Sequence, residues 1–177
     1  MIDDMESYDD DDNRIFDTWL DGFVNGSGAT VGYFEAPFAE RTIVNSGSQS
    51  MPLEYANGAA PFYSEAERDL GNMNLNTNGA DSLRLFVAGQ ADNTPESLYV
   101  AVEDANGKVA AVTHPDAGIT TGTEWTEWVI PFSDLAGVNL GRIATIYVGV
   151  GDRDNPAAGG AGLIFVDDIG YGRPAAD

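Results

Sequence analysis

The segment spanning residues 98–113 constrains the fold more than any other part of the sequence. Residues 98–104 (LYVAVED) alternate in side-chain character and lead to Asn106-Gly107. That dipeptide favours a two-residue hairpin turn, because Asn and Gly both tolerate positive φ. Residues 108–113 then supply a second run of β-forming side chains. The pattern predicts an antiparallel hairpin in the middle of the chain.

Strand signals continue along the whole chain, and helical signals are scarce. We expect further strands over residues 2–8, 30–34, 50–55, 82–88, 127–132, 144–151 and 162–169. Only residues 64–70 (SEAERDL) have a helical composition, enough for a turn or two. Short strands separated by Gly- and Asn-rich turns predict an all-β fold. We expect an antiparallel β-sandwich of jelly-roll type with two sheets. It would span residues 1–172, with residues 173–177 as a linker or tail remnant.

Alternation within the strands divides the side chains into two faces. Leu83, Leu85 and Val87 are expected to point inward, as are the valines and isoleucines of strands 98–104 and 144–151. The outward set is Arg84, Phe86, Tyr99, Glu103 and Tyr147. Aromatic rings beside hydrogen-bonding charges suit sugar recognition, because rings stack on pyranose faces and polar groups bind hydroxyls. Cross-strand packing of the same aromatic side chains is the alternative interpretation.

The charge composition excludes several classes of function. The chain of 177 residues carries 29 acidic and 8 basic side chains, a formal charge of −21. This argues against nucleic acids and anionic membranes, which are bound by Lys and Arg. The chain has no Cys and one His, so thiolate sites and multi-histidine metal sites are excluded. The acid excess is consistent with a solvated surface, adaptation to salt, or binding of a hard cation such as Ca²⁺.

The ends of the sequence bear on its location. The first residues, MIDDMESYDDDD, are acidic and unlike a signal peptide, and no apolar run is long enough for a membrane helix. The last residues, GYGRPAAD, read as the start of a linker. We therefore expect an extracellular or cell-surface module excised from a longer secreted chain. We expect a monomer, because the net charge opposes self-association.

Four segments resemble one protein family in order and spacing. They are residues 2–8 (IDDMESY), 45–51 (NSGSQSM), 125–134 (WTEWVIPFSD) and 165–171 (FVDDIGY). Together they resemble the bacterial jelly-roll, galactose-binding-like carbohydrate-binding modules. The pattern is most similar to the glucan-binding family-eleven modules. The resemblance covers nearly the whole chain, although each motif is short.

The resemblance implies a structural Ca²⁺ that joins the two ends of the chain. Carried over to this sequence, its ligands would be Glu6, Asp167, and backbone carbonyls near Ser46 and Gln49, with Asp4 as a further ligand. Carboxylates and carbonyls are the oxygen donors that Ca²⁺ prefers. The alternative is that these acids are solvated residues at strand ends. Residues 9–12 (DDDD) form either a second cation site or simply a charged loop.

The resemblance also implies a polysaccharide or oligosaccharide ligand on the concave sheet or at the loop rim. Its expected site comprises Arg84, Tyr99, Glu103, Tyr147, Tyr55, Asp152 and Arg153. Trp19, in a loop-like stretch, would mark a rim site instead, whereas Trp125 and Trp128 are expected in the core.

Three functions remain open from the sequence. The first is a non-catalytic carbohydrate-binding module tethered to a larger secreted enzyme or surface protein. The second is a glycoside hydrolase or lyase that uses groove carboxylates, with Glu103 and Asp152 as the candidate pair. The third is a structural adhesion module of a bacterial surface protein.

Overall fold

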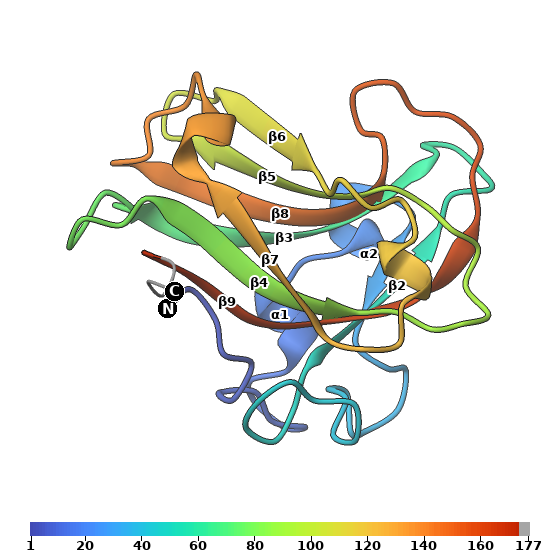
Figure 1. Cartoon of the computed structure of the whole chain (residues 1–177). Helices are drawn as coiled ribbons and strands as arrows, with labels where there is room; N and C mark the ends of the chain where they lie inside the picture. The colour runs from blue at the N-terminus through green and yellow to red at the C-terminus, as the bar shows by residue number, and fades with distance from the viewer. Residues whose placement is uncertain (174–177) are drawn as a thin grey trace.

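The computed structural model describes residues 1–173, so four of the five residues of the expected tail lie outside the described part. Two antiparallel sheets pack face to face as layers of a β-sandwich (Figure 1). One sheet has the strand order β1-β2-β9-β4-β7 and the other β3-β8-β5-β6. The predicted fold class is therefore confirmed.

Most strands that are consecutive in the sequence lie on different sheets, and the exceptions are the pairs β1–β2 and β5–β6. The strands are β1 (Ala29–Val31), β2 (Met51–Ala56), β3 (Tyr63–Met73), β4 (Ser82–Ala88), β5 (Leu98–Asp104), β6 (Val109–Thr113), β7 (Thr126–Pro131), β8 (Ile143–Gly151) and β9 (Ala161–Gly172). Two α-helical turns, α1 (Ile15–Thr18) and α2 (Gly22–Asn25), precede β1, and the 3₁₀ turns are Ile119–Thr121 and Phe132–Leu135.

The core lies between the sheets and is filled by the side chains that alternation predicted to point inward. Leu83, Leu85 and Val87 on β4 are fully buried. They face the valines and isoleucines of the other sheet, which are also fully buried: Val100, Val102, Ile146, Val148 and Val150. Burying each such side chain stabilises the fold by about 1.5–3 kcal/mol. Trp128 also belongs to the core, as predicted, whereas Trp125 is only half-buried.

Two predicted elements were wrong. Residues 64–70 form part of the long strand β3, not a helix, and pair with β8. Helix propensity amounts to tenths of a kcal/mol per residue, and tertiary pairing overrides it. Residues 2–8 form no strand either. Only Asp3 bridges to β9, at Ile169, and Met5 has a positive φ of 60° that turns the chain away.

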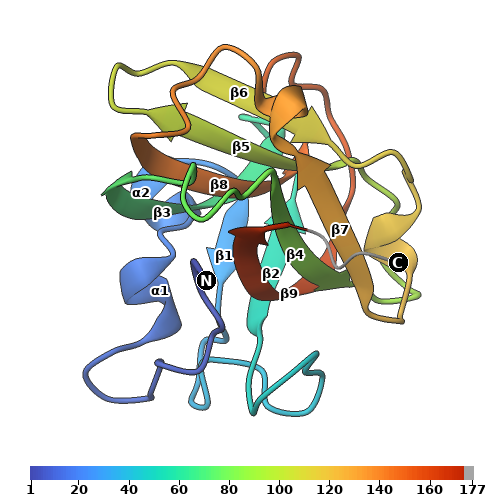
Figure 2. The ribbon, with the colours of Figure 1, turned by 60° about the vertical axis from the view of Figure 1, so that its left-hand side comes forward.

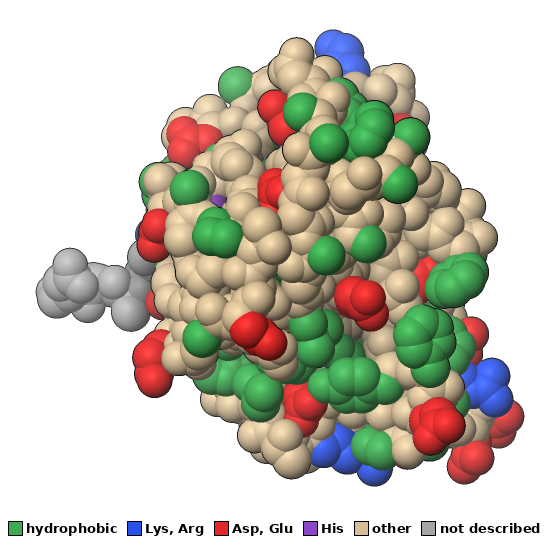
Figure 3. Space-filling model, turned by 90° about the vertical axis from the view of Figure 1, so that its right-hand side faces the viewer, with side chains coloured by type: hydrophobic (Ala, Val, Ile, Leu, Met, Phe, Trp, Pro, Cys, Tyr) green, Lys and Arg blue, Asp and Glu red, His purple; other side chains and the backbone are tan. Residues whose placement is uncertain are grey.

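The helical turns close one edge of the sandwich. Figure 2 shows α1 and α2 beside β3 and β1, the edge strands of the two sheets on that side. On the face shown in Figure 3, hydrophobic side chains gather over the lower half, with acidic side chains among them and few basic ones. Among residues 1–173, no helix is long and apolar enough to cross a membrane.

Candidate functional site

The outer face of the four-stranded sheet brings together three of the predicted site residues. Tyr99 and Glu103 lie on β5, and Tyr147 lies on the adjacent strand β8. Residues paired directly across strands point to the same side of a sheet. Tyr147 pairs with Ala101 on β5 and with Glu67 on β3. The predicted outward direction of these side chains is therefore confirmed.

Tyr99 lies across the neighbouring strand β8 because Gly149 leaves room for its ring. A Cβ atom at Gly149 would lie only 2.1 Å from Tyr99 Cζ. The Tyr99 hydroxyl passes over this glycine and donates a hydrogen bond of 2.7 Å to Glu65 Oε2 on β3. Burial, and then the Glu65 carboxylate, raise the pKa of Tyr99. Burial also raises the pKa of Glu65, despite the hydrogen bond from Tyr99 and the charge of Arg153.

Arg153 connects this pair to a second one. Its guanidinium lies 4.6 Å from the centroid of the Tyr147 ring, and Nη1 is 3.4 Å from Glu65 Oε2. Nη1 is buried and forms no hydrogen bond. The Tyr147 hydroxyl donates to Glu103 Oε2 at 2.8 Å. Five side chains from three strands and one loop thus form a continuous polar network, which we call the sheet-face cluster: Glu65, Tyr99, Glu103, Tyr147 and Arg153.

The geometry corrects the expectation that the two tyrosines offer open stacking surfaces. Tyr99 is 2% exposed and Tyr147 is 8% exposed, and both hydroxyls are used within the cluster. Glu103 and Arg153 remain partly exposed. The face therefore presents carboxylate and guanidinium groups more than aromatic rings, and such groups bind hydroxyls rather than stack.

Three other predicted site residues do not join the cluster. Arg84 lies on β4 in the other sheet, where its Nη1 is 3.8 Å from Glu127 Oε1. Alternation assigns a residue to a face of its own sheet but does not tell which sheet that is. Tyr55 is fully buried, and its hydroxyl donates to the Thr94 carbonyl at 2.6 Å. Asp152 is exposed, and its Oδ1 accepts N–H bonds from Asp154 and Asn155, which fix the turn after β8.

The candidate catalytic pair Glu103 and Asp152 is separated along the sheet. Glu103 pairs with Thr145 near the start of β8, whereas Asp152 follows the last residue of that strand. Seven residues of extended chain span about 23 Å. Glycosidase carboxylates lie about 5–9.5 Å apart. This pair therefore does not have the geometry that hydrolysis needs.

An apolar groove that the sequence patterns did not indicate lies at the edge of the sandwich beside α1 and α2. Its volume is about 520 Å³, and its walls come from α1, α2, β1 and the loop that follows β1. We call it the phenylalanine groove after four of its lining residues, Phe16, Phe23, Phe34 and Phe38. Phe23 and Phe34 are 80% and 76% exposed. The signal available in the sequence was the presence of these rings in otherwise polar loops.

Trp19 does not form a rim site, because it is fully buried and donates to Asp3 Oδ2 at 2.8 Å.

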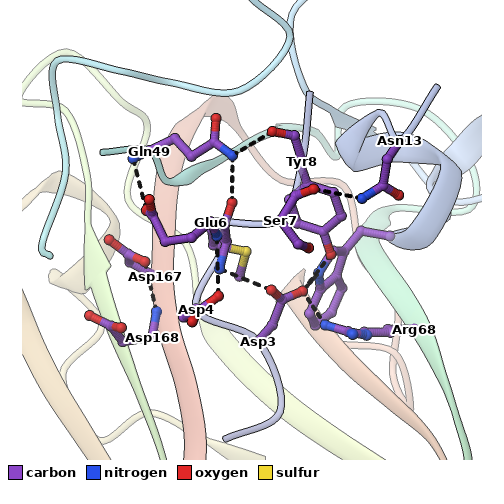
Figure 4. Close-up of polar contacts among 12 residues, drawn as sticks. Asp3, Asp4, Glu6, Ser7, Tyr8, Asn13, Gln49, Arg68, Asp167 and Asp168 are labelled. Atoms are coloured by element: carbon purple, nitrogen blue, oxygen red, sulfur yellow. Dashed lines mark hydrogen bonds and ion pairs between the residues drawn. The ribbon is translucent and has the colours of Figure 1, made fainter. Parts of the chain in front are cut away.

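All the residues expected to bind Ca²⁺ except Asp4 meet at one loop, residues 45–49 (Figure 4). Asp167 Oδ2 accepts N–H bonds from Asn45 and Ser46 at 3.0 and 3.3 Å. Glu6 Oε1 accepts the N–H groups of Ser48 and Gln49 at 2.9 and 3.1 Å. Ser46 and Gln49 thus reach the carboxylates through N–H groups, whereas the expectation named their carbonyls.

The pKa values of the Asp167 and Glu6 carboxylates shift in opposite directions. Asp167 is fully buried, and none of the ion pairs within residues 1–173 includes it. Burial raises its pKa to about 6, although the Ser46 and Asn45 N–H bonds lower it. Burial also raises the pKa of Glu6, but the hydrogen bonds from Ser48 and Gln49 outweigh it, and the pKa is lowered overall. Asp4 is exposed, and its Oδ1 accepts the Glu6 N–H at 3.2 Å.

Two of the four acids at residues 9–12 have structural partners. Asp9 Oδ1 accepts the N–H groups of Asp11, Asp12 and Asn13, and Asp10 Oδ2 pairs with Arg41 at 2.7 Å. Within the described part of the chain, no three acidic or histidine side chains cluster closely enough to hold a metal ion.

Comparisons with solved structures match this sandwich to carbohydrate-binding modules. A family 11 module from Clostridium thermocellum, in complex with a β-1,3-1,4-mixed-linked tetrasaccharide, has a TM-score of 0.50 and 17% identity, covering 86% of this chain and 92% of its own. A family 30 module of a cellulosomal cellulase from the same organism has a TM-score of 0.56 and 15% identity, with coverages of 78% and 82%. The chain shares the β-sandwich fold of these modules.

Larger enzymes contain a similar sandwich as a part. An exo-β-agarase matches with a TM-score of 0.60 and 14% identity over 83% of this chain, which is only 23% of the agarase chain. No family model matches the sequence, and no curated protein matches it either. The comparisons therefore describe the fold, at identities below 20%.

Proposed function

We propose that the protein is a non-catalytic carbohydrate-binding module that uses the outer face of its four-stranded sheet. The observation that carries the proposal is the sheet-face cluster, a preorganised polar network on a sandwich with the fold of carbohydrate-binding modules. The hydrogen bond from Tyr147 holds Glu103 in place before any ligand arrives, and the ion pair with Glu65 and the Tyr147 ring hold Arg153, so less conformational entropy is lost on binding.

Binding would proceed through hydroxyl contacts. The Glu103 carboxylate accepts hydrogen bonds, and the Arg153 guanidinium donates them, so together they recognise groups that do both. Hydrogen bonds to charged groups are worth about 1.5–3 kcal/mol each. A site built on a few of them binds weakly, and tethering to a larger secreted enzyme or surface protein would raise its effective affinity.

The two other functions have less support. The separation of Glu103 and Asp152 disfavours hydrolysis at that pair, although glycosidase chains contain a similar sandwich as a minor part. A purely structural adhesion module would make no use of the sheet-face cluster. Secretion and a monomeric state are parts of the same proposal.

The proposal is tested by affinity electrophoresis in gels that contain mixed-linked β-glucan, agarose, mannan or galactan. The wild type should be retarded by at least one of them. Glu103→Gln and Arg153→Met should each weaken that retardation about tenfold or more, because each removes a charged hydrogen bond. Arg84→Met removes the same charge from the opposite sheet and should bind like the wild type. A wild type that no polysaccharide retards would contradict the proposal.

We propose in addition a Ca²⁺ ion held by Glu6 and Asp167, with Asp4 and loop 45–49 nearby. The buried Asp167 carboxylate supports it, because a charge without a cationic partner is costly in the interior. Each carboxylate keeps free lone pairs beyond its N–H bonds, and oxygen is the donor that Ca²⁺ requires. Such an ion would join the N-terminal segment to β9.

Calorimetric unfolding in excess CaCl₂ and in EDTA tests whether the protein binds Ca²⁺. Ca²⁺ at about 100 times its Kd should stabilise the wild type by about 2.7 kcal/mol and raise Tm by several degrees. Asp167→Asn should abolish that rise. Asp104→Asn is the matched control, because Asp104 is similarly buried and also accepts three backbone N–H bonds, two from the β5–β6 turn and one from Asn139. An identical Tm of the wild type in both conditions would rule the ion out.

A further inference from the structure

We infer that the carbohydrate-binding surface continues past the sheet edge into the phenylalanine groove. The ligand is therefore a chain contacted over a greater length than the sheet alone spans. This inference rests on the proposed function and specifies the length and the neutrality of its ligand.

The groove and the sheet face are continuous through Leu20. Leu20 and Glu67 form an isolated antiparallel bridge, with both N–H groups bonded to the opposite carbonyl at 2.8 Å. Directly opposed residues point to the same side, so Leu20 lies on the face that carries Glu67 and Tyr147. Leu20 is also a wall residue of the phenylalanine groove. One surface therefore leads from the cluster over the edge strand β3 into the groove.

The register gives this surface a direction and a length. One row of paired residues crosses the sheet at right angles to the strands: Ala111, Ala101, Tyr147, Glu67 and Leu20. Four interstrand steps measure about 19 Å. The groove begins at the end of this row, so a ligand that follows the row reaches the phenylalanines as it leaves the sheet.

The helical turn α2, which carries Phe23, is fixed to the same edge strand. Asp21 caps α2, with Oδ1 accepting the Phe23 N–H at 3.0 Å and Oδ2 accepting the Val31 N–H at 2.9 Å. The Asn25 side chain and the Ser27 hydroxyl both donate to the Glu65 carbonyl at 3.0 Å. Glu65 belongs to the sheet-face cluster, so the groove and the cluster are held in one rigid relation.

The chemistry of the groove selects a neutral sugar chain. Exposed Phe23 and Phe34 rings offer the apolar surface on which pyranose faces stack, which the covered tyrosines of the sheet do not. The only charged side chains that line the groove within residues 1–173 are Asp17 and Asp21, and the whole chain carries −21 charges. Anionic glycans are repelled by this field. A volume of about 520 Å³ is in the usual range of ligand sites, about 300–1,000 Å³.

Titration calorimetry with two series of oligosaccharides, mixed-linked β-glucan and agarose fragments from disaccharide to octasaccharide, tests the inference. Wild-type affinity should continue to rise beyond the tetrasaccharide. The variant Phe23→Ser/Phe34→Ser should bind the tetrasaccharide like the wild type but the octasaccharide about tenfold more weakly. Val129→Ser is the control, because Val129 is an exposed apolar residue on β7, away from the groove.

The outcomes separate the two proposals. Equal length dependence in the wild type and the phenylalanine variant overturns the extension and leaves the sheet face as the site. Loss of affinity for every length in that variant, with Glu103→Gln binding normally, overturns both the extension and the sheet site. A wild type that binds no oligosaccharide and no parent polysaccharide overturns the proposed function itself.

Discussion

At the scale of single residues, buried carboxylates hold the loops of this sandwich by accepting several N–H groups at once. Glu40 is an example, because it is 8% exposed and lies between β1 and β2. Its Oε1 accepts the N–H groups of Thr42 and Ile43 and the Thr42 hydroxyl, and its Oε2 accepts the Tyr33 hydroxyl. Burial alone would raise the pKa of Glu40, but these hydrogen bonds lower it to about 2.

Because the folded protein holds the Glu40 carboxylate ionised, we predict that the protein loses stability in acid. Its pKa is about 2 in the folded chain, against an ordinary 4.5, so it stabilises the fold above pH 4.5. About 3 kcal/mol should be lost as the pH falls from 4.5 to 2. Urea unfolding of the wild type and Glu40→Gln should therefore show a difference at pH 7 that shrinks at pH 3. Glu35→Gln controls for the removal of one exposed charge, and a Glu40→Gln difference that does not change with pH would refute this role.

Residue roles of this kind could not be predicted from the sequence. Asp3 is one of several acids near the start of the sequence, yet it is 5% exposed and accepts hydrogen bonds from Tyr8, Trp19 and Arg68 (Figure 4). The donors come from segments up to 65 residues away. Only the fold brings these donors close to Asp3, and local sequence patterns do not indicate such long-range contacts.

At the scale of elements, the sequence patterns located most of the strands, but they predicted a strand at residues 2–8 that does not form and a helical turn at residues 64–70 that is a strand. The hairpin β5–β6 lies where Asn106-Gly107 predicted it, and β8 and β9 differ from expectation by a few residues at their ends. Residues 64–70 are rich in Glu, Ala and Arg and read as a helix. In β3 the same residues alternate Ser64 and Ala66 toward the core with Glu65 and Glu67 outward, a period of two that the helical composition obscured.

Gly149 determines how β5 and β8 combine into the sheet-face cluster. Gly149→Ala places a methyl group where the Tyr99 ring lies, so the ring must move and its bond to Glu65 must break. Such overpacking should cost about 1–3 kcal/mol. In a Tyr99→Ala background the same substitution should destabilise the protein much less, because the Tyr99 ring that the methyl group would meet is absent. Chemical denaturation of the four proteins of this double-mutant cycle measures the coupling, and strictly additive costs would contradict the packing described.

At the scale of the whole molecule, the all-β sandwich followed from the sequence and its surfaces did not. Strand patterns with few helical signals leave a two-sheet sandwich as the simplest way to bury one face of every strand. Alternation cannot assign a strand to a sheet, so it predicts one common face for Arg84 and Tyr99, which lie on opposite sheets. The phenylalanine groove joins α1, α2, β1 and a loop, an arrangement that no single pattern encodes.

The acidic residues of the chain have several distinct local roles. Glu65 and Glu103 belong to the sheet-face cluster, whereas Glu6 of the N-terminal segment and Asp167 of β9 meet at loop 45–49. Glu40 fastens another loop through its hydrogen bonds. The exposed majority solvates the surface and opposes the approach of anionic ligands.

The central claim is that polysaccharide binds on the outer face of the four-stranded sheet. Amide chemical-shift mapping of the labelled protein during titration with a mixed-linked β-glucan oligosaccharide tests it most directly. We predict that the largest changes fall on Glu67, Ala101 and Tyr147, with Arg84 and Glu127 unaffected on the opposite sheet. Changes centred on β4 and β7, or a saturating titration that leaves β5 and β8 unperturbed, would contradict the account.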